Sequence, residues 1–163
     1  MRTFLIVLSA MLSACATQAP EPAVCSNLPS GDYCAFDATR DAGEDVRIAQ
    51  EVAAREDLKT LIVMGANWCH DSRALAGTLR GDRFTPLLAE HYRLVYVDVG
   101  RKNRNLDIAR RFGLDDILGT PTVIIADSDG TVLNRDTAPT WRNAASRTED
   151  EIYDELERFA EME

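Results

Sequence analysis

The stretch of this chain with the clearest capacity for chemistry is GANWCHDSRAL, residues 65–75. Cys69 follows Trp68 directly, and Ser72 stands three positions further on. The apolar run before Cys69 predicts a buried strand and the residues after it predict a helix, so the sulfur should lie at a helix N-terminus. Unpaired backbone N–H groups and the helix dipole stabilise an anion there, which favours the thiolate, the nucleophile of disulfide exchange. The adjacent His70 would strengthen this effect when protonated.

These residues also have simpler interpretations. Cys69 could be a remnant without activity, Trp68 could only pack beside the site, and Ser72 could do no more than hydrogen-bond the sulfur. A metal site built on Cys69 and His70 would need further ligands, and His91 is the only other histidine of the chain. We therefore expect no metal.

The elements that must position Cys69 can be predicted from hydrophobic periodicity and turn residues. They are a helix over 41–58, a strand over 60–66, helices over 71–79 and 83–92, a strand over 93–99, a helix over 105–113, a strand over 120–127, an edge strand over 131–135 and a final helix from 148. After the leading helix, strands and helices alternate. This order predicts a single α/β domain with a mixed central sheet flanked by helices.

The first and last helices have the clearest buried faces. The first is expected to face the core with Val46, Ala49, Val52 and Ala53. The last opens with Thr148 and has Glu151 three positions later, the spacing of a capping box. Its inner face is expected to consist of Ile152, Leu156 and Phe159.

Two short motifs resemble the thioredoxin superfamily: ANWCHDS at residues 66–72 and GTPT at residues 119–122. Members usually carry WCxxC at a strand–helix junction and, later in the chain, a Thr-Pro or Ile-Pro pair that packs opposite it. The resemblance implies a thioredoxin-like three-layer sandwich over residues 41–163, with a cis peptide bond before Pro121. It also implies that Thr120 offers backbone groups to a substrate peptide and that Trp68 borders the substrate-binding surface.

Two residues depart from the pattern of that family. Ser72 stands where the second cysteine is expected, and Val63 stands where thioredoxins carry a buried acid that assists proton transfer. Serine cannot form a disulfide, so Cys69 would stay joined to a substrate until another thiol arrives. Members with CxxS motifs work through glutathione or hold client thiols. The resemblance therefore implies monothiol exchange by Cys69, Ser72 and His70, with glutathione or another thiol as co-substrate and no bound cofactor.

The first residues resemble the leader of an exported bacterial lipoprotein. A positive start and about a dozen apolar residues, fewer than the ~20 that span a bilayer, end in LSAC at residues 12–15. This lipobox-like pattern implies a signal peptide over residues 1–14 and a Cys15 that carries acyl chains such as palmitate. Ala16, rather than an aspartate, favours the outer membrane. An ordinary signal peptide that happens to contain a cysteine is the alternative.

The other cysteines are expected to follow the redox compartment. Exported chains meet an oxidising environment in which thiols tend to pair. Cys25 and Cys34 flank a stretch with proline and glycine that can turn back on itself, so we favour a local disulfide between them. Residues 15–40 would then hold the lipidated cysteine, a tether and this loop. The rival is a bridge from Cys69 to Cys25 or Cys34, which would make that partner a resolving cysteine.

Composition limits the partners of the chain. Its 163 residues carry a formal net charge of -9, which repels nucleic acid. Residues 101–111 are a local exception with five cations. They form either a solvated loop and helix face or a docking patch for a carboxylate-bearing ligand such as glutathione, or for an acidic partner.

Together these patterns predict a lipid-anchored protein of the bacterial cell envelope that faces the periplasm. Its partners would be cysteine-containing exported proteins, with which it exchanges thiols and disulfides through Cys69. The alternative is a non-catalytic binding module that presents the same fold as a platform to an envelope partner.

Overall fold

The computed structural model describes Cys25 and residues 30–162. The expected signal peptide, the lipidated Cys15 and the tether lie outside these residues. Within them, no helix is both long enough and apolar enough to cross a bilayer.

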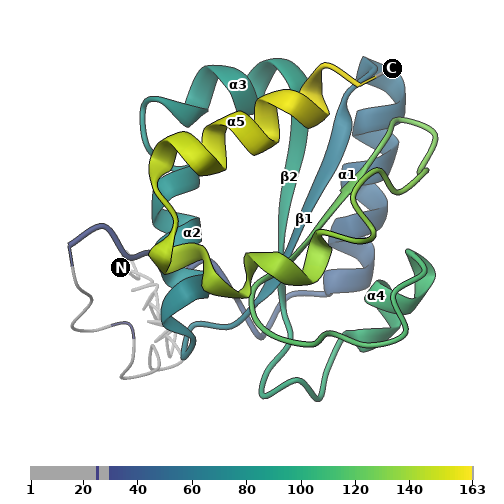
Figure 1. Ribbon diagram of the computed structural model, residues 1–163. Helices are drawn as coiled ribbons and strands as arrows, with labels where there is room; N and C mark the ends of the chain where they lie inside the picture. Colours follow the sequence, from purple (N-terminus) through teal and green to yellow (C-terminus); the bar gives the residue numbers. More distant parts are fainter. Residues whose placement is uncertain (1–24, 26–29, 163) are drawn as a thin grey trace, which may run out of the picture.

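The described chain folds as one unit of helices around a short sheet (Figure 1). The elements are α1 (Ala42–Glu56), β1 (Lys59–Gly65), α2 (His70–Leu79), α3 (Phe84–His91), β2 (Tyr92–Asp98), α4 (Leu106–Arg111), β3 (Thr122–Ala126), the 3₁₀ helix η2 (Ala138–Ser146) and α5 (Glu149–Ala160). The predicted α/β fold class is confirmed, and the predicted element bounds are close to those observed. The segment η2 was not predicted.

The sheet has the strand order β2-β1-β3. β1 is parallel to β2, with Gly65 opposite Asp98, and antiparallel to β3, with Met64 opposite Thr122. The predicted mixed sheet is therefore confirmed. The end of β1, the end of β2 and the beginning of β3 lie at the same edge, and the candidate site is built there.

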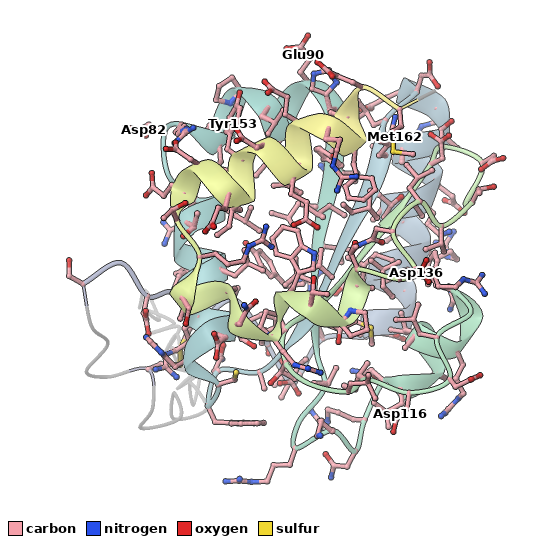
Figure 2. All side chains as sticks on the ribbon, viewed as in Figure 1. Asp82, Glu90, Asp116, Asp136, Tyr153 and Met162 are labelled. Atoms are coloured by element: carbon pink, nitrogen blue, oxygen red, sulfur yellow. A yellow bond between two sulfur atoms is a disulfide. The ribbon has the colours of Figure 1, made fainter. Side chains whose placement is uncertain are left out.

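Helices cover both faces of the sheet, which makes three layers. Strand side chains alternate between the two faces, so Leu61 and Val63 of β1 join one buried cluster while Ile62 and Met64 join the other. The first cluster is completed by α2, α3 and α5, and the second by α1 and α4. Figure 2 shows side chains filling the space between α5 and the strands.

Local sequence accounts for the helix ends. Asp41 caps α1 by accepting a hydrogen bond from the backbone of Glu44. The predicted capping box of Thr148 and Glu151 is present at the start of α5. The predicted inner face of α5 is buried, as are three of the four residues expected on α1, with Val52 only half-buried.

The predicted edge strand over residues 131–135 is wrong. A single β-bridge joins Ala126 to Val132, and the side chain of Asn134 then takes over the pairing. Its Oδ1 accepts from the Ile125 N–H at 2.8 Å, and its Nδ2 donates to the Val123 carbonyl at 2.8 Å. A buried amide thus satisfies backbone groups of β3 that a neighbouring strand would otherwise pair.

We expect Asn134→Ala to lower the free energy of unfolding by roughly 2–4 kcal/mol, because it leaves one buried donor and one buried acceptor unpaired. Urea unfolding followed by circular dichroism measures the change. Asn143→Ala is the matched control, since Asn143 is exposed and its loss should change stability by less than about 0.5 kcal/mol. Equal stabilities of the two variants would contradict this role of Asn134.

Candidate functional site

Cys69 lies at the junction between β1 and α2, as the sequence predicted. Its N–H donates to the Ala66 carbonyl at 3.0 Å, which closes the turn after the strand. Cys69 has extended backbone angles and is the N-cap of α2, which begins at His70. The sulfur therefore belongs to the residue directly before the first turn of α2, where the backbone N–H groups have no partner within the helix.

The position of Cys69 at a helix start in a thioredoxin-like fold would lead one to expect a sulfur that faces solvent, and the structure contradicts this expectation. Only 8% of the surface of Cys69 is exposed. Its thiol donates a hydrogen bond to the Thr120 carbonyl over an Sγ–O distance of 3.1 Å. The segment before β3 therefore covers the sulfur, a long-range contact that the position at a helix start could not reveal.

The segment opposite Cys69 has the predicted backbone form. The peptide bond between Thr120 and Pro121 is cis, which confirms the expectation for that proline. Thr120 and Pro121 are buried, and β3 starts at the next residue. The structure thus brings Cys69, Thr120 and Pro121 together, although 51 positions separate the first two in the sequence.

Ser72 lies on the inner side of the first turn of α2. It is fully buried, and its Oγ accepts a weak hydrogen bond of 3.4 Å from the Ala66 N–H. A Cβ added at Gly65 would lie 2.7 Å from this oxygen, so the backbone of β1 passes close to it. In the structure, the Ser72 hydroxyl is therefore hydrogen-bonded to the backbone of Ala66. The role of Ser72 as a partner of the Cys69 thiolate stays a prediction.

The other predicted members of the site have different surroundings. His70 is exposed at the first position of α2. Asp71 accepts from the Ala145 N–H at 3.0 Å, so it fastens the end of η2 to α2. The local sequence around Asp71 gives no signal for this contact, because Ala145 lies 74 positions away in the chain.

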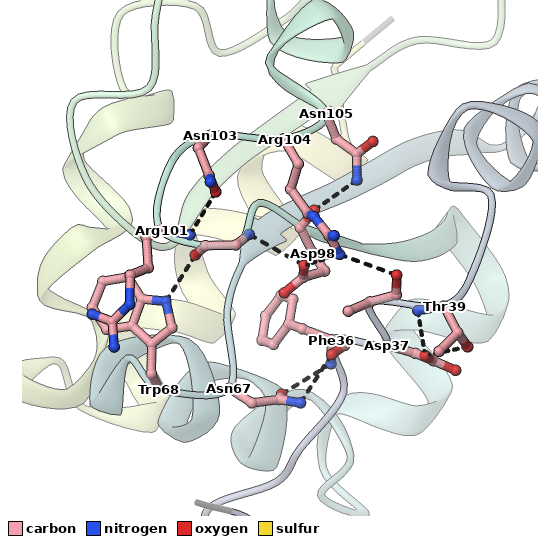
Figure 3. A network of polar contacts seen from close by, with 12 residues as sticks. Phe36, Asp37, Thr39, Asn67, Trp68, Asp98, Arg101, Asn103, Arg104 and Asn105 are labelled. Carbon is pink, nitrogen blue, oxygen red and sulfur yellow. Dashed lines mark hydrogen bonds and ion pairs between the residues drawn. The ribbon is translucent and has the colours of Figure 1, made fainter. Parts of the chain in front are cut away.

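Trp68 projects from the site and is 44% exposed. Its indole N–H donates to the Gly100 carbonyl at 2.7 Å, and the Arg101 guanidinium lies 5.8 Å from its ring centroid (Figure 3). Leu118, two residues before Thr120, is 65% exposed. Two large apolar side chains are thus available to a ligand near Cys69.

The loop of residues 99–105, which follows β2, is held in place by side chains of its own neighbourhood. Asp98 accepts from Arg104 at 3.2 Å and from the Gly100 N–H at 3.2 Å. The Asn105 amide donates to the Asp98 carbonyl at 2.7 Å. Gly100, Lys102 and Asn105 have positive φ angles, which give the loop its tight course.

A second segment before α1 supports the site from the other side. The Asn67 amide makes two hydrogen bonds with the backbone of Phe36, at 3.1 and 2.9 Å. Asp32 pairs with Arg73 of α2 at 2.9 Å. Sequence reasoning missed Asn67 and Arg73, because their partners lie more than thirty positions away in the chain.

Cys25 and Cys34 are joined by a disulfide, the local pairing that the sequence favoured. Among the residues that the structure describes, Cys69 is the cysteine with a free thiol. In this structure, neither Cys25 nor Cys34 is bonded to the sulfur at the site.

The carboxyl group of Asp37, in the segment before α1, has a lowered pKa. Hydrogen bonds from the hydroxyl and then the backbone N–H of Thr39 lower the pKa of Asp37. Asp37 and Thr39 are both labelled in Figure 3.

The chain was compared with protein families, curated proteins and solved structures, and it is similar to some of the solved structures. No protein-family model matches it, and no curated protein matches it. The crystal structure of a disulphide isomerase from Xylella fastidiosa Temecula1 is 35% identical, covers 79% of this chain and 98% of that chain, and has a TM-score of 0.73. The C-terminal domain of DsbD from Neisseria meningitidis, in its oxidised form, is 18% identical over 62% of this chain and 83% of that chain, with a TM-score of 0.44.

Proposed function

This chain belongs to the thioredoxin-like superfamily, and on that premise we propose that it exchanges thiols and disulfides through the single sulfur of Cys69. One observation carries the proposal: Cys69 is the N-cap residue of α2, and its sulfur contacts the Thr120 carbonyl beside the cis Thr120–Pro121 bond. Ser72 occupies the position of a second thiol, and Cys25 and Cys34 are bonded to each other. The name of the Xylella relative, a disulphide isomerase, supports the same chemistry.

The first step is attack by the Cys69 thiolate on one sulfur of a client disulfide. The client S–S bond breaks as the Cys69–client S–S bond forms. The second client sulfur leaves as a thiolate and takes up a proton, while the proton of Cys69 passes to solvent. One disulfide replaces another, so the step needs no oxidant or reductant.

The second step releases Cys69 and needs a thiol from outside the site, because Ser72 cannot supply one. If a thiol of the client attacks its own sulfur in the mixed disulfide, a new client disulfide forms and the result is isomerisation. If two small thiols of the glutathione class react in turn, the client leaves reduced and the small thiol leaves as its disulfide. A slow second step favours isomerisation, since it gives client thiols time to react.

Exchange also requires that the client uncover the sulfur. The hydrogen bond from Cys69 to the Thr120 carbonyl must break before the thiolate can attack. A client backbone N–H that donates to the same carbonyl would compensate for the lost bond. Trp68 and Leu118 border the position such a segment would take. We assign Thr120, Pro121 and Trp68 to substrate binding on this basis.

We place the protein in the bacterial envelope, held to the outer membrane by acyl chains on Cys15 and facing the periplasm. The sequence of residues 1–16 supports this placement. Several acyl chains anchor a protein stably, at about 0.8 kcal/mol per buried methylene. The clients would then be exported proteins with cysteines.

The proposal is tested by trapping mixed disulfides in intact cells that express the full chain with its own leader. After acid quenching and alkylation, we expect Cys69-dependent adducts on non-reducing gels, which disappear on reduction. Cys69→Ala is the comparison. If wild type and Cys69→Ala give the same bands, the monothiol mechanism is refuted.

A non-catalytic platform is the second candidate. The buried thiol of Cys69, engaged with Thr120, favours it, because a resting sulfur in that state is poorly reachable. Client binding that persists in Cys69→Ala, together with an absence of trapped disulfides, would support the platform over the exchange reaction.

A further inference from the structure

We propose that the loop of residues 99–105 selects clients with acidic residues beside the reactive cysteine, and that Arg101 and Lys102 determine this specificity. The inference rests on the proposed exchange at Cys69, because it concerns which polypeptides reach that sulfur. It goes beyond the exchange reaction by naming the chemistry of the client segment.

The loop is physically joined to the site. Trp68 precedes Cys69 in the chain, and its indole N–H is bonded to the Gly100 carbonyl at 2.7 Å. Arg101, the next residue, lies against the exposed indole ring, as Figure 3 shows. A client segment that contacts Trp68 on its way to Cys69 therefore meets the side chain of Arg101.

The charges of this loop are not equivalent. Arg104 pairs with Asp98 at 3.2 Å and also donates to the Ala38 carbonyl at 3.0 Å, so it serves to hold the loop. Arg101 and Lys102 are exposed, and no carboxylate of the described residues lies within ion-pair distance of either. These two cations are available to a ligand, whereas Arg104 is already engaged.

The loop presents these cations in a fixed form. Besides the contacts of Asp98, the Arg101 N–H donates to the Asn103 side chain at 3.0 Å. Lys102 itself has a φ of 61°, a conformation that the surrounding hydrogen bonds maintain. A loop whose backbone is fixed by hydrogen bonds restricts the positions of its charged side chains, so less conformational entropy is lost when a carboxylate binds.

The sign of the loop contrasts with that of the whole chain. The protein carries a net charge of -9, yet residues 99–105 contain three cations and no acid. An acidic client is repelled by most of this surface and attracted at the loop beside Cys69. Such complementarity acts mainly on encounter and orientation, and it is screened beyond about 8 Å at physiological ionic strength.

The test compares two peptide disulfides that differ only in the residues flanking the reactive cysteine, glutamate in one and glutamine in the other. At low salt, we expect wild type to react about tenfold faster with the glutamate peptide. The ratio should fall to about one in Arg101→Gln/Lys102→Gln and should shrink as salt is added. Arg110→Gln/Arg111→Gln, on α4, changes the net charge equally and should keep the ratio.

A binding measurement keeps this proposal separate from the exchange reaction. Both peptides, with serine in place of cysteine, are titrated into Cys69→Ala while the fluorescence of the exposed Trp68 is followed, with Trp68→Phe as the blank. We expect about tenfold tighter binding of the glutamate peptide, dependent on Arg101 and Lys102.

Equal binding of the two serine peptides overturns the selection proposal, whether or not exchange occurs. An equal loss of preference in the α4 variant also overturns it, because the effect would then be one of net charge alone. A loop-dependent affinity for S-methylglutathione without any peptide preference would assign the loop to a small thiol instead. A charge preference in binding without Cys69-dependent reaction would leave selection standing and refute the exchange reaction.

Discussion

Cys69→Ala is expected to reduce exchange on a peptide disulfide to the rate measured in buffer alone. Among the described residues, Cys69 is the cysteine that is not part of a disulfide, and alanine offers no nucleophile in its place. Because the substitution also removes the donor to the Thr120 carbonyl, we expect a modest loss of stability of about 1 kcal/mol. The rate is measured by chromatography of the peptide products under conditions where both proteins are folded.

The matched control is the double variant Cys25→Ser/Cys34→Ser. It removes the other two described cysteines and should cost about 2–3 kcal/mol by the chain-entropy estimate for a short loop. Its exchange rate should nevertheless stay within about twofold of wild type. If this folded variant loses exchange as completely as Cys69→Ala, one of the two cysteines acts as a resolving thiol and the monothiol mechanism is wrong.

The second large effect is a gain of function in Ser72→Cys. Ser72 lies in the first turn of α2, three positions after Cys69 and on the inner side of the helix. A thiol there attacks the mixed disulfide within the same molecule, and such intramolecular reactions have large effective concentrations. We expect release of a client at least tenfold faster than in wild type, and a Cys69–Cys disulfide in the oxidised variant.

Turnover of a model protein disulfide in the presence of a dithiol reductant measures this gain. Ser72→Ala serves as the control, since it alters the same buried position without adding a thiol. It should show the slow release of wild type. A folded Ser72→Cys variant that forms no disulfide with Cys69 would show that the first turn of α2 cannot support the expected chemistry.

Local signals in the sequence were enough to locate Cys69 between its strand and its helix. An apolar run, a Trp-Cys pair and a helical pattern place Cys69 at the start of α2. The cis bond before Pro121 was implied by the resemblance of the GTPT motif to the thioredoxin superfamily. The capping box of Thr148 and Glu151 likewise depends on residues three positions apart.

Contacts between distant segments could not be predicted in this way. The resemblance to the thioredoxin superfamily placed Thr120 and Pro121 opposite Cys69, but the hydrogen bond to the Thr120 carbonyl that buries the sulfur was not predicted. The same holds for the bond from Trp68 to Gly100, which joins the basic loop to the site. At residues 131–135 the position after the DSDG turn of residues 127–130 suggested a returning edge strand. The buried amide of Asn134 pairs with β3 there instead.

The most direct test of this account is intact-mass analysis of the purified wild-type protein after incubation with a peptide disulfide. We predict one peptide adduct per molecule, mapped to Cys69, with the Cys25–Cys34 bridge unchanged and with release by added glutathione. A protein that stays folded and gains no adduct at Cys69, or that gains it at Cys25 or Cys34, would contradict the claim that Cys69 is the exchanging sulfur.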